Sequence, residues 1–233
     1  PARGGVKTTL FEKAEKLGGL VRNVIPGFRI SDGAIDNDAK LIEAMGVEIV
    51  TGREIGSVDE VKKDYDYVVL ALGASTPGVL RLEKGQAMNA LEFLAQFKAT
   101  DGNLDLGENV VVIGGGNTAM DTARAAKRNK GVKKVSLVYR RTKRYMPADA
   151  EELEMAIEDG VEFAELLSPV KLENGVLYCK KMVLGDYDAS GRRGVVETDE
   201  VVEVPADTVI AAVGEKVPGA FYEANGIALD NRG

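Results

Sequence analysis

Short runs of consecutive apolar residues alternate along this chain with longer segments in which apolar residues recur every three or four positions. The first pattern is typical of strands covered on both faces of a parallel sheet, and the second is typical of helices that pack on one side. Strands that alternate with helices predict an α/β protein with doubly wound parallel sheets.

The apolar runs and the helical spacing also give the expected positions of the elements. We expect strands over 6–11, 47–50, 67–72, 109–113, 134–139, 161–167, 176–184, 201–204 and 208–213. We expect helices over 36–45, 88–97, 117–129 and 151–159, with a helical turn over 58–63 and a loop over 74–86.

A glycine-rich turn lies where the strand expected over 109–113 meets the helix expected over 117–129. It has the pattern GxGxxA, in which Gly114 allows a tight turn, Gly116 lets a pyrophosphate approach, and Ala119 lets the helix pack closely. Phosphates would bind the backbone N–H groups at the positive end of the helix dipole. The alternative is a turn that only joins strand to helix. The candidate dinucleotide-binding residues are Gly114, Gly115, Gly116, Asn117, Thr118 and Ala119.

The residues after the strand expected over 134–139 distinguish NAD from NADP. An NAD site usually places Asp or Glu there to bind the ribose 2′-hydroxyl, whereas this chain places Arg140 and Arg141 there, followed by Lys143 and Arg144. Guanidinium groups bind a 2′-phosphate through charge and a planar fork of donors. The sequence therefore predicts NADPH as the cofactor, with a solvated basic loop as the alternative interpretation.

Composition excludes several other classes of protein. The 233 residues carry a net charge of -7 and have a pI near 4.9, so nucleic acid is not an expected partner. The sequence has no histidine and a single cysteine, Cys179, which excludes histidine triads, a CxxC redox pair and a cysteine-held iron–sulfur cluster within these residues. No metal site is predicted. No apolar stretch has the length of a membrane span, so we expect a cytoplasmic protein without a membrane partner.

Several motifs near the glycine turn point to a known family. They are GGGNTAMD at 114–121, Tyr-Arg-Arg at 139–141, Met-Pro at 146–147, Glu-Glu at 151–152 and EDGVEF at 158–163. Together they resemble the small subunit of NADPH-dependent glutamate synthase and its relatives, among them the electron-input half of dihydropyrimidine dehydrogenase and a selenate reductase subunit. The resemblance covers nearly the whole chain. It implies a Rossmann-like NADPH domain inserted in an FAD-binding domain of the pyridine nucleotide-disulfide oxidoreductase type.

The segments 10–20 and 25–29 are similar to the flavin segment of that family. The resemblance implies that Glu12 binds the FAD ribose, because a carboxylate can accept from two neighbouring hydroxyls, and that Arg29 meets the FAD diphosphate. Without the resemblance, the alternative interpretations are simpler: Glu12 is an exposed charge at a strand end, Gly18–Gly19 is a plain turn, and Arg29 is a surface residue. Ile55 and the Ala-Val-Gly run at 212–214 are then ordinary core. The resemblance assigns Glu12, Gly18, Gly19, Leu20, Arg29 and Ile55 to FAD, and Ala212, Val213 and Gly214 to NADP.

Two motifs of the family are missing from this sequence. The flavin domain of the family opens with a strand and a GxGxxG turn upstream of the position of Glu12, and it ends with a Gly-Asp motif beyond the equivalent of Gly214. We therefore expect a central fragment with a partial FAD-binding domain over 1–80, an NADPH-binding domain over 81–216 and the start of the returning FAD segment over 217–233. Relatives of the pyrimidine dehydrogenase type also have an arginine where Pro147 stands, so a third phosphate contact must come from Lys143 or Arg144.

The resemblance implies an enzyme in which NADPH passes a hydride to FAD. Electrons would then leave to a partner subunit or domain that carries iron–sulfur clusters or the acceptor site. The catalytic residues are unknown, and Asp121, Glu151 and Glu152 are the polar candidates. The alternative is that Asp121 is a structural polar group on the helix after the turn, and that the two glutamates stabilise the first turn of their own helix. Two alternatives remain open: an NADP-dependent dehydrogenase without flavin, which would need a positioned proton donor, and a non-catalytic dinucleotide-binding module.

Overall fold

The computed structural model describes residues 1–187, 189 and 191–230 and divides the chain into two compact units. The first unit combines Pro1–Thr76 with Glu215–Gly233, of which 231–233 lie outside the described residues. The second unit is Pro77–Gly214, so it is inserted in the first unit along the sequence. The short strands β3 (Thr76–Pro77) and β12 (Glu215–Lys216) pair where the chain passes from one unit to the other.

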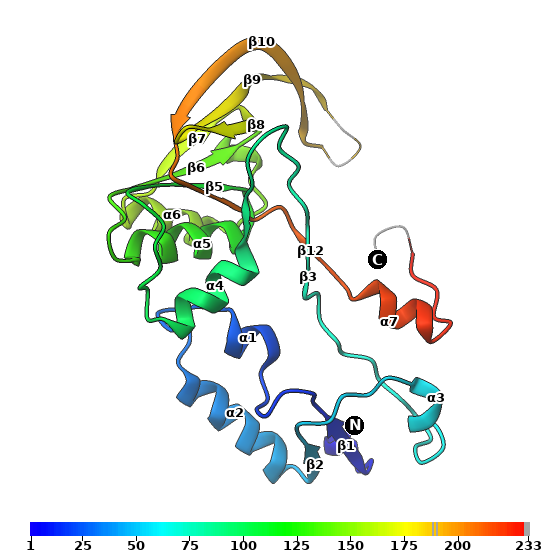
Figure 1. Cartoon of the computed structure of the whole chain (residues 1–233). Coiled ribbons are helices and arrows are strands. Elements are labelled where there is room, and N and C mark those ends of the chain that lie inside the picture. Colours follow the sequence, from blue (N-terminus) through cyan, green and yellow to red (C-terminus); the bar gives the residue numbers. More distant parts are fainter. Residues whose placement is uncertain (188, 190, 231–233) are drawn as a thin grey trace. The chain divides into compact units, whose positions relative to one another are not determined.

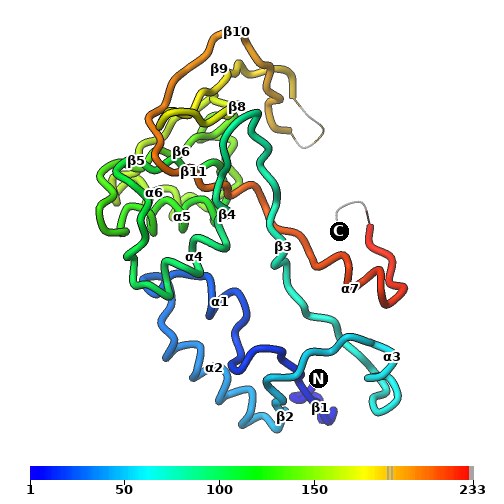
Figure 2. Tube along the Cα trace, in the orientation of Figure 1, coloured from blue at the N-terminus to red at the C-terminus, as the bar shows by residue number. Residues whose placement is uncertain are grey.

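A five-stranded parallel sheet forms the centre of the second unit (Figures 1 and 2). Every neighbouring pair of strands is parallel, so the carboxyl ends of the strands meet at one edge of the sheet. Open α/β sheets bind their ligands at that edge. In spatial order, the strands are β4 (Met88–Asn89), β11 (Thr208–Ala211), β5 (Asn109–Ile113), β6 (Lys134–Tyr139) and β7 (Glu162–Glu165).

Three helices cover one face of this sheet, and α5 lies between the other two (Figure 1). They are α4 (Ala90–Ala99), α5 (Asn117–Arg128) and α6 (Ala150–Glu158). Ala119, Ala123 and Ala126 of α5 have no exposed surface, which allows the helix to lie close to the sheet. The side chain of Asn89 caps α4 by accepting from the N–H of Leu91 at 2.9 Å, and this cap explains why the helix begins at Ala90.

Strands, and not helices, cover the other face of the parallel sheet. They form an antiparallel sheet of β8 (Leu167–Glu173), β9 (Val176–Tyr187) and β10 (Arg193–Pro205). Alternate residues of the central strands, including Val111 and Val138, form one core with Leu177, Cys179 and Val204 of this sheet. Burial in that core raises the pKa of the Cys179 thiol to about 12, which keeps it protonated and unreactive at neutral pH.

The first unit contains a parallel strand pair, β1 (Thr8–Phe11) and β2 (Val47–Val50), and several short helices. Asn225 joins distant segments of this unit: its Oδ1 accepts from the N–H of Val58 at 2.7 Å, and its Nδ2 donates to the carbonyl of Gly56 at 3.2 Å. The helices are η1 (Ala2–Gly4), α1 (Gly19–Asn23), α2 (Asp32–Ala44), α3 (Val58–Val61) and α7 (Gly219–Ala224).

Most of the expected elements are confirmed, and the strands over 109–113 and 134–139 agree residue for residue. The strand expected over 161–167 is two strands, because Leu166 adopts a φ of +57° between β7 and β8. The strand expected over 67–72 is wrong. That segment forms no strand, and 87% of Tyr67 and 79% of Val69 are exposed. In the described part of the chain, β1 and β2 pair only with each other, and the segment 67–72 joins neither of them.

No helix in the described part of the chain combines the length and the apolar character needed to cross a membrane.

Candidate functional site

The glycine turn joins β5 to α5 at the carboxyl edge of the parallel sheet. Gly114 has a φ of +152°, and a Cβ atom on it would lie 2.4 Å from the carbonyl oxygen of Ala212. A Cβ atom on Gly115 would lie 2.5 Å from the ring of Tyr139. The protein's own packing therefore requires glycine at both positions.

Gly116 differs from these two glycines. Its φ of -95° is open to any residue, and a Cβ atom on it would meet nothing closer than Pro147, whose Cγ would be 4.0 Å away. Packing within the chain therefore does not explain a glycine here, whereas the close approach of a ligand does. Gly116 is also the N-cap of α5 and has no side chain to bind the N–H groups of the first turn, which suits an anion.

Asn117, Thr118 and Ala119 follow Gly116 and have different roles in the candidate phosphate site. The Asn117 side chain is bound to Asp149, with Nδ2 donating to Oδ2 at 2.8 Å and Oδ1 accepting from the Asp149 N–H at 2.9 Å. Asn117 therefore offers a ligand its backbone N–H, as Thr118 does at the next position. Ala119 is fully buried, and its Cβ lies 3.0 Å from where a Cβ on Gly114 would stand, so a larger residue would open the turn.

The end of β11 lies beside the glycine turn. The Ala212 N–H donates to the carbonyl of Ile113 at 2.8 Å, which continues the pairing of β11 with β5. Gly214 follows with a φ of +101°, and its carbonyl accepts from the N–H of Gly78 at 2.7 Å. Val213, between them, is 41% exposed. The structure thus brings Ala212–Gly214 to the same sheet edge as the turn.

Two hydrogen bonds hold the basic loop after β6, one to the glycine turn and one to the end of β6. The Ala148 N–H donates to the carbonyl of Gly115 at 3.0 Å, and the Tyr139 hydroxyl donates to the carbonyl of Tyr145 at 3.0 Å. Within the loop, η2 spans Lys143–Tyr145. The backbone of the loop therefore lies beside the uncapped end of α5.

The four basic side chains of this loop are not equivalent. Arg140 is exposed, whereas Arg141 is only 9% exposed and its Nε donates to the carbonyl of Arg193 at 2.9 Å. The Lys143 ammonium lies 5.1 Å from the Phe163 ring centroid, and the Arg144 guanidinium lies 6.0 Å from that of Tyr145. Sequence reasoning found all four cations, but it missed the carbonyl that holds Arg141.

Charged residues bind α5 to α6 behind the turn. Asp159 accepts from Arg124 Nε at 2.7 Å and from Arg128 Nη1 at 2.5 Å, and the hydrogen bond from Arg128 lowers its pKa. Asp121 and Glu152 are buried on these helices, with Glu152 Oε2 4.0 Å from Arg124 Nη1. Asp121 and Glu152 are thus buried between the helices, which favours a structural role for them, whereas Glu151 is exposed on α6.

Glu12 directly follows β1 in the first unit. Its N–H donates to the carbonyl of Val50 at 2.9 Å, and its own carbonyl accepts from the Arg53 N–H at 3.0 Å, so β2 and the segment after it fix its backbone. Its Oε1 accepts from the N–H of Ala14 at 2.8 Å. This bond orients the carboxylate and leaves Oε2 as the oxygen that a ligand hydroxyl could reach.

The Gly18–Gly19 turn depends on a buried arginine that sequence reasoning missed. Both glycines have positive φ, +124° and +49°, and Leu20 follows them in α1. Arg22 is 7% exposed, and its Nε donates to the carbonyl of Leu17 at 2.5 Å while its Nη2 donates to Asp36 Oδ1 at 2.5 Å. A Cβ on Gly18 would lie 2.8 Å from the Cβ of Arg22, so this arginine and the turn pack directly.

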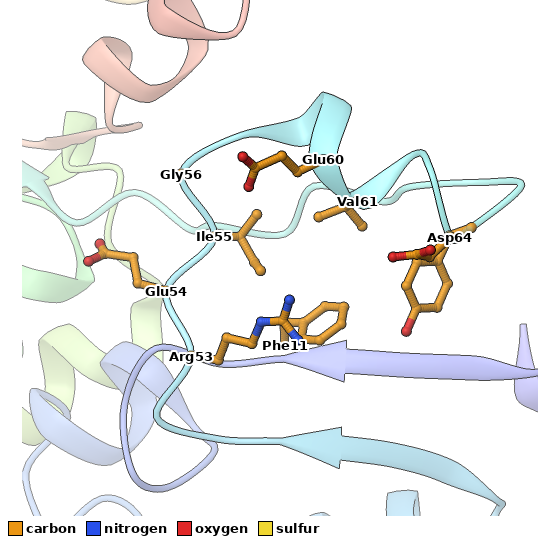
Figure 3. Close-up of a pocket in the computed structure, with 9 residues that line it drawn as sticks. Phe11, Arg53, Glu54, Ile55, Gly56, Glu60, Val61 and Asp64 are labelled. Atoms are coloured by element: carbon orange, nitrogen blue, oxygen red, sulfur yellow. The ribbon is translucent and has the colours of Figure 1, made fainter.

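Ile55 lines a small pocket of about 150 Å³ in the first unit, shown in Figure 3. The Arg53 guanidinium lies 4.8 Å from the centroid of the Phe11 ring, and Ile55 and Val61 face the same space. Arg29, by contrast, lies in an exposed turn closed by its N–H to the carbonyl of Pro26 at 2.9 Å. Ile55 is therefore among the residues that line this pocket, and Arg29 is not.

Comparison with known families gives this geometry a context. The family model described as pyridine nucleotide-disulphide oxidoreductase matches residues 31–233. The chain belongs to the pyridine nucleotide-disulphide oxidoreductase family. This confirms the expected α/β fold of the pyridine nucleotide-disulphide oxidoreductase type.

Individual relatives confirm the resemblance to the glutamate synthase small chain. That protein from Escherichia coli K12 is 35% identical over 99% of this chain and 54% of its own length. The NADP(+)-dependent formate dehydrogenase subunit beta of Moorella thermoacetica is 34% identical over 98% of this chain and 34% of its own. A protein named as an oxidoreductase, YgfK of E. coli K12, is 40% identical over 100% of this chain and 23% of its own. The chain thus spans from about a quarter to about half of these relatives.

Solved structures show the same fold at low sequence identity. Mycobacterium tuberculosis FprA in complex with NADPH has a TM-score of 0.75 at 20% identity, over 92% of this chain and 66% of FprA. Thioredoxin reductase of T. acidophilum has a TM-score of 0.56 at 18% identity, over 100% of this chain and 77% of its own. These likenesses support the architecture of the pyridine nucleotide-disulphide oxidoreductase family.

Proposed function

We propose that this chain is the nucleotide-binding part of an NADPH-dependent flavin oxidoreductase, in which NADPH binds the second unit and FAD binds the first. When bound, NADPH supplies a hydride and FAD accepts it. This chain supplies the binding groups, their orientation and the local charge. The proposal agrees with the names of the relatives, which include the NADPH-dependent glutamate synthase small chain and an NADPH-Fe(3+) oxidoreductase subunit.

One observation carries the nucleotide assignment: the open space above Gly116. The glycine turn is packed tightly at Gly114 and Gly115, yet it is open at Gly116, where the first N–H groups of α5 have no side-chain cap. A pyrophosphate fits this cradle because it needs both close backbone approach and unpaired donors. Ala212–Gly214, at the neighbouring strand end, would border the same nucleotide.

The basic loop supports NADPH over NADH. Arg140 and Arg141 follow β6, the strand next to the glycine turn, and Lys143 and Arg144 come directly after them. In a chain of net charge -7, this local cluster of cations would hold a phosphate against the overall field. We therefore assign the 2′-phosphate to Arg140 and Arg141, and a further contact to Lys143 or Arg144.

The first unit has a partial set of groups for FAD. The Glu12 carboxylate is oriented at the end of β1, the Gly18–Gly19 turn is held by Arg22, and Ile55 borders a pocket next to β1. Val24, Pro26, Ile35 and Val58 are the buried apolar side chains of this unit among the described residues. So thin a core suits a unit that gains further residues in the complete protein.

A redox partner belongs to the same proposal. The described residues include one cysteine, Cys179, which is buried and protonated, so electrons cannot pass to a disulfide within this part of the chain. We propose that they pass to an iron–sulfur cluster or an acceptor site carried by another subunit or domain. The relatives named as subunits of formate dehydrogenase and NADPH-Fe(3+) oxidoreductase agree with such an assembly.

The first experiment is a calorimetric titration of the chain with NADPH and, separately, with NADH. Tight binding of NADPH with weak binding of NADH supports the glycine turn and the arginine pair together. Equal binding of the two would contradict the 2′-phosphate assignment, and binding of neither would contradict the nucleotide site.

The flavin assignment needs its own test. A longer chain that restores the strand and GxGxxG turn upstream of Glu12 should purify yellow, with FAD released on denaturation. The matched control is the same longer chain with Glu12→Ala, which should retain less FAD. A folded but colourless product from the unaltered sequence would favour a dehydrogenase without flavin or a non-catalytic module.

A further inference from the structure

Arg141 is a buried cation whose partner comes from a distant part of the second unit. Its Nε donates to the carbonyl of Arg193, at the start of β10, which is 52 residues away along the chain. The Arg141 carbonyl accepts from the N–H of Leu166 at 3.2 Å, and the Leu166 carbonyl accepts from the Met182 N–H at 2.7 Å. Arg141 is therefore attached to the antiparallel sheet by both its side chain and its backbone.

The side chain of Arg193 holds the opposite strand of the β9–β10 hairpin. Its Nε donates to the carbonyl of Gly185, and its Nη2 donates to the carbonyl of Leu184 at 3.2 Å. Its guanidinium also lies 5.2 Å from the ring centroid of Tyr187. The pairing of β9 with β10 shifts register between Arg193 and Val195, so these bonds close an irregular part of the ladder.

These contacts form one continuous path from the hairpin to the basic loop. The side chain of Arg193 fixes the irregular pairing, the pairing fixes the Arg193 carbonyl, and that carbonyl fixes one edge of the Arg141 guanidinium. A guanidinium that is already oriented loses less conformational freedom when it binds a phosphate. Partial burial also strengthens its attraction for an anion, because the local dielectric is lower than that of water.

We propose that Arg193 is a positioning residue for 2′-phosphate recognition, and that a 2′-phosphate on Arg141 is coupled to the irregular β9–β10 pairing. This inference rests on the proposed NADPH function of the same site. It adds a specificity element from the antiparallel sheet to a site otherwise built from the parallel sheet. Arg193 acts through Arg141, since its own guanidinium is bound to the hairpin.

The binding test uses adenosine 2′,5′-bisphosphate and 5′-AMP, which differ only in the 2′-phosphate. Arg193→Ala removes the side-chain bonds that hold the Arg193 carbonyl in place, so the hydrogen bond from Arg141 to that carbonyl should weaken. Binding of the bisphosphate should fall about fivefold, the size expected for the loss of one hydrogen bond, and binding of 5′-AMP should stay within about twofold. Arg193→Lys should recover part of the loss. Lys181→Ala is the matched control, because it removes a cation of the same hairpin whose ion pair is with Glu200. Equal losses for both probes, or equal effects of Arg193→Ala and Lys181→Ala, would overturn the inference.

Hydrogen exchange gives a second readout on the full chain. Coupling is reciprocal, so the bisphosphate should slow amide exchange around Leu184 and Val195, whereas 5′-AMP should not. Without any nucleotide, Arg141→Ala should speed exchange at the same amides, and Lys181→Ala should not. If the wild-type chain binds neither the bisphosphate nor NADPH, the proposed function fails. If it binds both and exchange at the hairpin never responds, the proposed function stands and this inference is overturned.

Discussion

The carbonyl oxygen of Ala212 lies only 2.4 Å from the point where a Cβ on Gly114 would stand. The end of β11 thus closes over the turn between β5 and α5, and both belong to the proposed nucleotide site. A methyl group at position 114 would collide with this backbone and would also need a φ of +152°. The glycine turn and the Ala212–Gly214 segment therefore depend on one another for their positions.

Gly114→Ala should consequently damage the fold as well as the site. Overpacking and backbone strain together should lower the free energy of unfolding by about 3 kcal/mol. Chemical denaturation followed by circular dichroism measures this change. A variant as stable as the wild type would mean that β11 can move away from the turn.

Gly116→Ala should separate binding from stability. A Cβ at this position meets nothing closer than 4.0 Å. The free energy of unfolding should therefore fall by no more than about 1 kcal/mol, the typical effect of alanine at an N-cap. The added methyl would stand where the pyrophosphate must approach, so NADPH and NADH should both bind at least tenfold more weakly, by about 1.4 kcal/mol. Calorimetry with both nucleotides tests this, with Gly219→Ala as the control, because Gly219 has open space and no positive φ and lies at the start of α7, outside the turn. Unchanged binding by a folded Gly116→Ala would move the phosphates elsewhere.

The two arginines after β6 should respond differently to mutation. Arg140 is exposed, so Arg140→Ala should change the free energy of unfolding by less than about 0.5 kcal/mol. Arg141→Ala removes the donor to the Arg193 carbonyl and should cost about 1 to 2 kcal/mol of stability. The double variant should weaken NADPH binding by about 2 to 4 kcal/mol and hardly affect NADH, because only NADPH carries the 2′-phosphate. Titration with both nucleotides gives the comparison, and a parallel loss of NADH would remove the arginines from the 2′-phosphate site.

The strengths and the failures of sequence reasoning follow from where each interaction lies along the chain. The strand, turn and helix over 109–128 are local features, and the sequence alone predicts them together with the candidate phosphate cradle. The carbonyl that holds Arg141 comes from Arg193, and no local pattern joins residues 52 positions apart. The apolar run over 67–72 predicts a strand that the structure does not form, because periodicity cannot tell whether a neighbouring strand is present to pair with it.

Asp159 makes the stability of the second unit depend on pH. Hydrogen bonds from Arg128 and Arg124 hold its pKa below the ordinary value of 3.8, so the unfolded chain binds this proton more readily than the folded chain. Its contribution to stability should therefore be complete above about pH 4 and disappear as the pH falls through the folded pKa.

Asp159→Asn should lower the free energy of unfolding by about 2 to 3 kcal/mol at pH 7, and that free energy should then decline less steeply in acid than in the wild type. Urea denaturation at several pH values measures both effects, and Glu158→Gln, a neighbouring exposed carboxylate, is the control. A wild-type acid profile identical to that of Asp159→Asn would contradict the assignment.

Arg22 offers a test of how the first unit prepares its proposed flavin site. It holds the loop before α1 through the carbonyl of Leu17, packs against Gly18, and pairs with Asp36 of α2. Arg22→Met keeps much of the side-chain volume and removes these hydrogen bonds, so the Gly18–Gly19 turn should become less well ordered. In the longer, FAD-binding chain, we expect Arg22→Met to release FAD at least tenfold more readily, and NADPH to bind the second unit as before. Arg3→Met, an exposed arginine of the same unit, is the matched control. Wild-type flavin retention by Arg22→Met would mean that the turn keeps its shape without this arginine, and a simultaneous loss of NADPH would show that the damage is not confined to the first unit.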